Sequence, residues 1–125
     1  MLKARRAFVI AFACVFVAVA IYLFLTPREV RLVALVGDKV AHVGAFGLMM
    51  MLCAAIVTTR KATAWIAFVL IALGIAIELA QSLTGYRDFE ADDMLADTAG
   101  VLIAWAAVAL SAFLDSRRSS ATGPS

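Results

Sequence analysis

The sequence predicts an all-α fold: an integral membrane bundle of four transmembrane helices, with both termini in the cytoplasm. The chain is 65% hydrophobic with a mean hydropathy of +1.00, well above the roughly half-apolar composition of a soluble domain. It contains four apolar segments of about 20 residues, the length at which a helix crosses a hydrocarbon core of about 30 Å. The small net charge of +2, without a basic stripe, excludes a nucleic-acid-binding protein.

The four apolar segments are expected to form one domain, residues 1–115. They run from Ala7 to Thr26, from Asp38 to Thr58, from Ala62 to Thr84 and from Asp93 to Leu114. The connection between the second and third segments is so short that these two helices should form an antiparallel hairpin. Residues 116–125 are polar and include Gly and Pro, so they are expected to be a disordered cytoplasmic tail.

The first segment has two interpretations. It follows three basic residues and contains Ala18-Val19-Ala20, which fits a signal-peptide cleavage site. However, its apolar stretch continues to Leu25 before Pro27 ends the helix, which is longer than the usual apolar region of a signal peptide. We therefore favour a retained membrane anchor, and cleavage would leave the orientation of the other three helices unchanged.

The distribution of Lys and Arg sets the predicted orientation, because cytoplasmic loops carry an excess of both. With the N-terminus inside, the 11 basic residues divide into 7 inside and 4 outside. The inside group is Lys3, Arg5, Arg6, Arg60, Lys61, Arg117 and Arg118, and the outside group is Arg28, Arg31, Lys39 and Arg87. Both termini of this multi-pass protein should therefore be cytoplasmic.

Polar residues converge on the outer ends of three predicted helices. Asp38 and His42 are four residues apart at the start of the second helix, so they lie on one face. Glu78 and Gln81 are three apart near the end of the third helix. Ionisable groups inside a membrane are expensive to bury, so each is a candidate functional residue.

The fourth helix adds a stripe of Asp93, Asp97 and Gly100 on one side, where Gly100 would allow a neighbouring helix to approach closely. Arg87, in the preceding loop, is the natural counter-ion for these acids. We therefore expect one outer polar pocket, with His42, Glu78 and Asp97 within direct or one-water hydrogen-bonding reach. Its predicted residues are Asp38, Lys39, His42, Glu78, Gln81, Arg87, Asp93 and Asp97.

Simpler roles compete with a pocket. Asp92 and Asp93 fit ordinary caps at a helix start, as does Asp38, and Lys39 can extend its ammonium to the lipid headgroups. His42 can serve as a hydrogen-bonded contact between helices rather than as a catalyst. For Glu78 we favour a role in the site, because a carboxyl group about two turns below the membrane interface must be protonated or paired.

No cofactor is predicted. Cys14 and Cys53 do not make a zinc-type spacing with the single histidine, and no nucleophile motif or glycine-rich phosphate loop is present. One histidine with two or three carboxylates can hold Zn²⁺ or Mn²⁺, but this pattern alone does not indicate a metal site.

The residues gathered above resemble the VanZ-like family of small membrane proteins. The resemblance spans Asp38 to Gly100 and rests on three motifs in order. These are Asp-Lys-x-x-His (Asp38, Lys39, His42), Glu-x-x-Gln (Glu78, Gln81) and a loop Arg followed by Asp and Gly (Arg87, Asp93, Gly100). The family usually has Asn where this chain has Asp97, which weakens any role that requires a neutral amide at that position.

The resemblance implies a location in the bacterial cytoplasmic membrane and a link to the cell envelope, since the founding member is associated with reduced susceptibility to the glycopeptide teicoplanin. We expect the pocket to bind or modulate a lipid-linked envelope component or a glycopeptide-related ligand. One alternative is a membrane-embedded enzyme with His42, Glu78 and Asp97 as candidate acid-base residues. Another is a structural subunit of an envelope complex.

Overall fold

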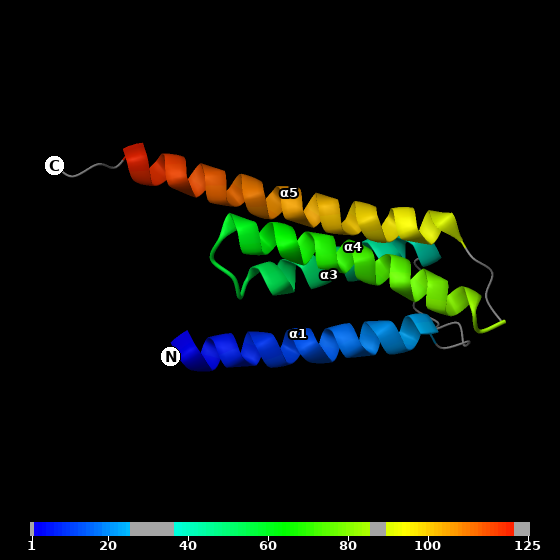
Figure 1. Ribbon diagram of the computed structural model, residues 1–125. Helices are drawn as coiled ribbons and strands as arrows, with labels where there is room; N and C mark the ends of the chain where they lie inside the picture. The colour runs from blue at the N-terminus through cyan, green and yellow to red at the C-terminus, as the bar shows by residue number, and fades with distance from the viewer. Residues whose placement is uncertain (1, 26–36, 86–89, 122–125) are drawn as a thin grey trace.

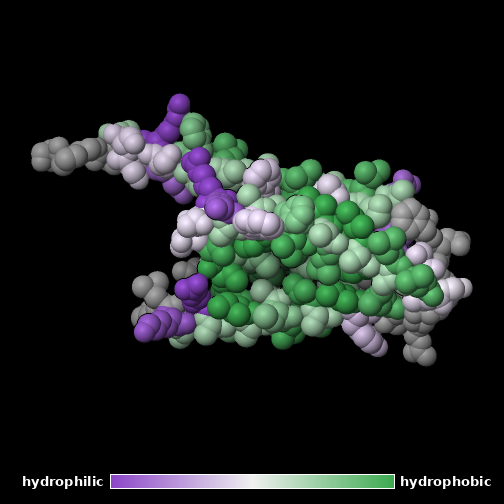
Figure 2. All heavy atoms as spheres, viewed as in Figure 1, coloured by the Kyte–Doolittle hydropathy of each residue, from purple (hydrophilic) through white to green (hydrophobic). Residues whose placement is uncertain are grey.

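The computed structural model describes residues 2–25, 37–85 and 90–121, and these residues form an all-α bundle of four helices (Figure 1). The helices are α1 (Leu2–Leu25), α3 (Asp38–Ala54), α4 (Arg60–Ser82) and α5 (Ala91–Ala121). Three of them, α1, α4 and α5, are long and apolar enough to cross a membrane. A sheath of apolar side chains covers most of the face seen in Figure 2, as expected for a protein surrounded by lipid.

Helix α3 is shorter than the sequence predicts, because it ends at Ala54 rather than at Thr58. Its 17 residues give a length of about 26 Å at 1.5 Å per residue. Residues 55–58 form the turn instead, in which the N–H groups of Ile56 and Val57 bond to the carbonyls three residues earlier. Thr59 is then the N-cap of α4, with an extended backbone and a side chain that accepts a 3.1 Å hydrogen bond from the Ala62 N–H.

The turn between α3 and α4 reverses the chain, so these two helices are antiparallel neighbours (Figure 1). This confirms the predicted hairpin. The same reversal brings the start of α3 and the end of α4 to one end of the bundle, where α5 begins (Figure 1).

Helix α5 continues to Ala121, past Ser116, where the sequence predicts a disordered tail. Serine hydroxyls in this last stretch bond back to carbonyls one turn earlier, as from Ser119 to Asp115 and from Ser120 to Ser116. The prediction of disorder is therefore wrong for residues 116–121. These residues are exposed and helical.

The core lies mainly between α3, α4 and α5, and α5 packs most extensively against α3. Phe46, Met49 and Met50 of α3 and Val101 of α5 are fully buried in it. The predicted close approach at Gly100 is confirmed: a Cβ at this position would lie 2.3 Å from the carbonyl oxygen of Val43. No side chain larger than hydrogen fits there without separating α3 from α5.

Candidate functional site

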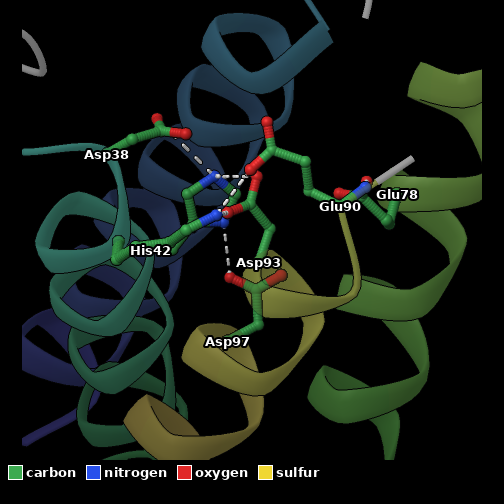
Figure 3. A network of polar contacts seen from close by, with 7 residues as sticks. Asp38, His42, Glu78, Glu90, Asp93 and Asp97 are labelled. Carbon is green, nitrogen blue, oxygen red and sulfur yellow. Dashed lines mark hydrogen bonds and ion pairs between the residues drawn. The ribbon is translucent and has the colours of Figure 1, made fainter. Parts of the chain in front are cut away.

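Six charged or ionisable side chains gather at the end of the bundle where α3 and α5 begin (Figure 3). We call them the polar cluster: Asp38, Lys39, His42, Glu90, Asp93 and Asp97. All of them come from α3, from α5 or from the residue immediately before α5. The seam between these two helices therefore carries the cluster.

His42 is the centre of the cluster and is 1% exposed. Its Nδ1 is hydrogen-bonded to Oδ1 of Asp97 at 2.8 Å. Its Nε2, on the other side of the ring, lies 3.7 Å from Oδ2 of Asp93 and 4.0 Å from Oδ1 of Asp38. The imidazole is thus surrounded by three carboxyl groups (Figure 3).

Helix periodicity explains this arrangement. Asp38 and His42 are one turn apart on α3, and Asp93 and Asp97 are one turn apart on α5, so each pair lies on a single helix face. Because both helices begin at this end, the positive ends of their dipoles also favour carboxylates there. The predicted grouping of these four side chains is confirmed.

Lys39 links the cluster to its exposed rim. Its ammonium donates to Oε2 of Glu90 at 2.7 Å and to Oδ1 of Asp93. The side chains of Lys39 and Glu90 are 42% and 53% exposed, whereas that of Asp93 is 2% exposed. Lys39 therefore makes specific ion pairs, beyond the headgroup contact that a terminal lysine would make by itself.

Glu78 and Gln81 of α4 are both buried at this end of the bundle. Oε1 of Glu78 accepts a 2.6 Å hydrogen bond from the backbone N–H of Glu90. Glu78 is thus joined to the cluster through the start of α5, and it lies beside Glu90 rather than against the imidazole (Figure 3). The sequence predicts His42, Glu78 and Asp97 within direct or one-water reach of one another, and the structure confirms this for His42 and Asp97.

Arg87, the counter-ion expected from the sequence, lies outside the described residues, so its role stays a prediction. In the described part of the chain the cation that pairs with the acids is Lys39.

Sequence reasoning did not assign Glu90 or Gly74 to the site. For Glu90 the sequence offers a signal, which is its position three residues before Asp93. In the structure its carbonyl accepts a 3.0 Å hydrogen bond from the Asp93 N–H. Gly74 of α4 gives no such signal, because its contribution is space: a Cβ there would lie 2.8 Å from Oδ2 of Asp97. Only the packing of α4 on α5 shows that Asp97 occupies the volume that Gly74 leaves.

The arrangement has two chemical capacities. A carboxylate that accepts from Nδ1 of His42 orients the ring and selects its tautomer, as in acid-base sites. In addition, Asp38, His42 and Asp93 each direct one possible metal-ligand atom to a common region, with these atoms within 4.8 Å of one another.

Comparison with known proteins identifies the family. The comparison found no matching curated protein and no matching solved structure. The family model described as VanZ/LLP1 matches residues 3–112, which includes all the residues of the polar cluster and most of every helix. The match confirms the resemblance seen in the motifs and extends it over α1, and the chain belongs to the VanZ/LLP1 family.

Proposed function

We propose that this protein spans the bacterial cytoplasmic membrane four times and uses the polar cluster, at the outer face, to recognise the headgroup of a lipid-linked cell-envelope component. Through that ligand it modulates susceptibility to glycopeptides such as teicoplanin. The observation that carries the proposal is the half-exposed rim of Lys39 and Glu90 above a buried His42 and Asp93. A rim of this kind, fixed by two packed helices, suits headgroup recognition.

The free-energy cost of burying the ionisable groups of the cluster supports a functional role. His42 lies about 6 Å along α3 from Asp38, and Asp97 lies about 9 Å along α5 from its first residue. Charges held at such depths in a membrane protein are costly and commonly mark binding or transport sites. Lipid contact alone would be met by apolar residues at these positions.

The distribution of basic residues supports the outer location. One group lies at the helix ends opposite the cluster, at the starts of α1 and α4 and at the end of α5: Lys3, Arg6, Arg60, Lys61, Arg117 and Arg118. A basic end of a bundle faces the cytoplasm by the positive-inside rule. The cluster then faces outward, where envelope precursors are assembled and glycopeptides act.

The exposed charges of the rim restrict the chemical class of ligand that the cluster can bind. Lys39 offers one cation, while the carboxylates of Asp38 and Glu90 are 39% and 53% exposed. A ligand that combines an anionic group for Lys39 with amines or sugar hydroxyls for the carboxylates would satisfy both kinds of partner.

Lipid co-purification tests the proposal. The full chain, Lys39→Gln and the matched control Lys61→Gln are extracted with native lipids, and the bound lipids are identified by mass spectrometry. Lys61 is an exposed lysine at the far end of the bundle. We expect a lipid-linked species with wild type and Lys61→Gln that is lost in Lys39→Gln, together with a matching change in teicoplanin susceptibility. The same lipid profile in all three proteins would refute headgroup recognition.

An enzyme is the second candidate, favoured by the 2.8 Å contact between the buried His42 and Asp97. In this alternative, His42 acts as the general acid or base on a lipid-linked substrate and Asp97 orients it. Turnover of the co-purified lipid by wild type, abolished in His42→Gln while the lipid still binds, would identify catalysis. Bound lipid that stays unchanged in both proteins would exclude it, and a complete lack of bound lipid in a well-folded protein would indicate a structural role for the cluster.

A further inference from the structure

The two nitrogens of His42 face different surroundings. Nδ1 is bonded to Asp97 at 2.8 Å, whereas Nε2 faces Oδ2 of Asp93 at 3.7 Å and Oδ1 of Asp38 at 4.0 Å. The last two separations exceed hydrogen-bond length. They are close to the separation of about 3.4 Å between neighbouring ligand atoms of a tetrahedral metal whose bonds are about 2.1 Å long.

We propose that Nε2 of His42 and the carboxylates of Asp38 and Asp93 form a binding site for one divalent transition-metal ion, Zn²⁺ or Mn²⁺. The three ligand atoms lie within 4.8 Å of one another. Imidazole nitrogen suits transition metals, and carboxylate oxygen suits Mn²⁺ and is also a common ligand of Zn²⁺. A set of one nitrogen and two oxygens therefore selects these ions over Mg²⁺ and Ca²⁺, which prefer oxygen alone.

The groups behind the ligands support this assignment. Metal-bound histidines usually donate their second ring N–H to a carboxylate, and metal-bound carboxylates are usually hydrogen-bonded in turn. His42 and Asp93 meet these conditions: Asp97 holds Nδ1 of His42, and Lys39 holds Oδ1 of Asp93, which leaves Oδ2 directed toward the imidazole. With Nδ1 donating to Asp97, the lone pair of a neutral imidazole is on Nε2, the atom that faces the two carboxylates.

Three protein ligands leave at least one coordination position open, as in catalytic rather than structural zinc sites. The side chain of Asp38 is 39% exposed, so this ligand connects the buried part of the site with the surface. An anionic headgroup reaching the rim could complete the coordination. Metal binding itself does not depend on the proposed lipid ligand.

The single histidine of the chain allows a direct test without mutation. Full-length protein without an affinity tag, labelled with ¹⁵N only in histidine, is freed of metal by chelation and loaded with Mn²⁺ alone. Pulsed electron paramagnetic resonance should show a hyperfine coupling from the ¹⁵N label, which can come only from His42. Bound Mn²⁺ without this coupling, or no saturable binding of Mn²⁺ or Zn²⁺, would overturn the site.

Affinity measurements identify the carboxylate ligands. Equilibrium dialysis of Zn²⁺ or Mn²⁺ should give about one ion per wild-type chain. Asp97→Asn, behind the histidine, should weaken binding about 10- to 100-fold. Asp38→Asn, at a partly exposed position, removes a ligand and should weaken binding at least as much. The matched control Asp92→Asn, an exposed carboxylate next to Asp93, should change it less than about 2-fold. Equal affinities in wild type and Asp38→Asn would contradict the assigned ligand set.

The metal and lipid proposals fail separately. Loss of lipid binding after removal of the metal would show that the ion bridges the headgroup. Retained lipid binding by a protein that never binds metal would refute the metal site alone. Saturable metal binding with the histidine coupling, in a protein that retains no envelope lipid, would support the metal site and refute headgroup recognition.

Discussion

The seam between α3 and α5 and the packing of α1 represent two different ways to hold a helix in this bundle. At the seam, Gly100 brings the backbones into contact at Val43, and buried polar side chains cross from one helix to the other. Helix α1 packs on α3 and α4, and its buried residues are the small alanines Ala13 and Ala20. In lipid, helix association depends on close packing and polar contacts rather than on a hydrophobic driving force.

This difference indicates that the sequence requirements of the fold are strictest at the seam between α3 and α5. Many apolar sequences could form α1, because several of its large side chains, including Phe8, Val15 and Tyr22, are exposed on the described surface. The seam tolerates far fewer sequences, because a single added carbon atom at Gly100 would collide with the backbone of α3. Substitutions should therefore cost much more stability at the seam than on α1.

The largest expected effect is at Gly100. Gly100→Ala would place a Cβ against the carbonyl of Val43 and force the two helices apart. We expect a loss of about 3 kcal/mol in the free energy of unfolding, measured by reversible denaturation in mixed micelles. Gly44→Ala is the matched control, because a Cβ there meets nothing within 4 Å. Equal stabilities for the two variants would show that the backbones are not in contact.

The next effect is at Asp97. Asp97→Asn preserves shape but removes the negative charge beside His42, so unfolding should become easier by about 1–2 kcal/mol. The control Asp92→Asn removes an exposed carboxylate one residue before Asp93 and should change the same free energy by less than about 0.5 kcal/mol. If Asp97→Asn leaves the free energy of unfolding unchanged, the polar contact does not stabilise the seam. The contrast between the seam and α1 would then rest on the glycine contacts alone.

A smaller loss is expected for Gly74→Ala, which presses a methyl group against the carboxylate of Asp97. The side chain can rotate away, so the cost should be about 1 kcal/mol. The displaced carboxylate should also alter the ¹⁵N chemical shifts of the His42 ring. Unchanged shifts with unchanged stability would show that α4 does not confine Asp97.

The smallest effect is expected on α1. Val15 is 62% exposed, so Val15→Ala should change the free energy of unfolding by less than about 0.5 kcal/mol in the same micelles. A loss as large as that at Gly100 would mean that α1 is held as specifically as the seam, and the contrast between the two regions would disappear.

Much of the fold was predictable because lipid imposes simple requirements. Apolar segments of spanning length identified the positions of the four described helices. The end of α3 at Ala54 was not predictable in the same way, because the sequence stays apolar through Val57 while the backbone already turns toward the cap at Thr59. The helical extension to Ala121 was missed for a related reason: composition favoured disorder, whereas local serine-carbonyl contacts continue the helix.

The site was predictable where helix periodicity decides which residues share a face. The spacings of Asp38 with His42 and of Asp93 with Asp97 predicted their grouping, which the structure confirms. The partners of Lys39 and Glu78 depend instead on where the start of α5 lies relative to α3 and α4. That placement is a tertiary property, and for the same reason the space left by Gly74 could not be inferred from the sequence.

A double-mutant cycle between His42→Gln and Asp97→Asn tests most directly whether α3 and α5 share one buried polar contact. The stabilities of wild type, both single variants and the double variant are compared in mixed micelles. A coupling energy of about 0.6 kcal/mol, and at most about 1.7 kcal/mol, is expected, since these are the mean and the maximum measured for such contacts in membranes; none is expected between His42→Gln and Asp92→Asn. Strictly additive effects of His42→Gln and Asp97→Asn would contradict the account.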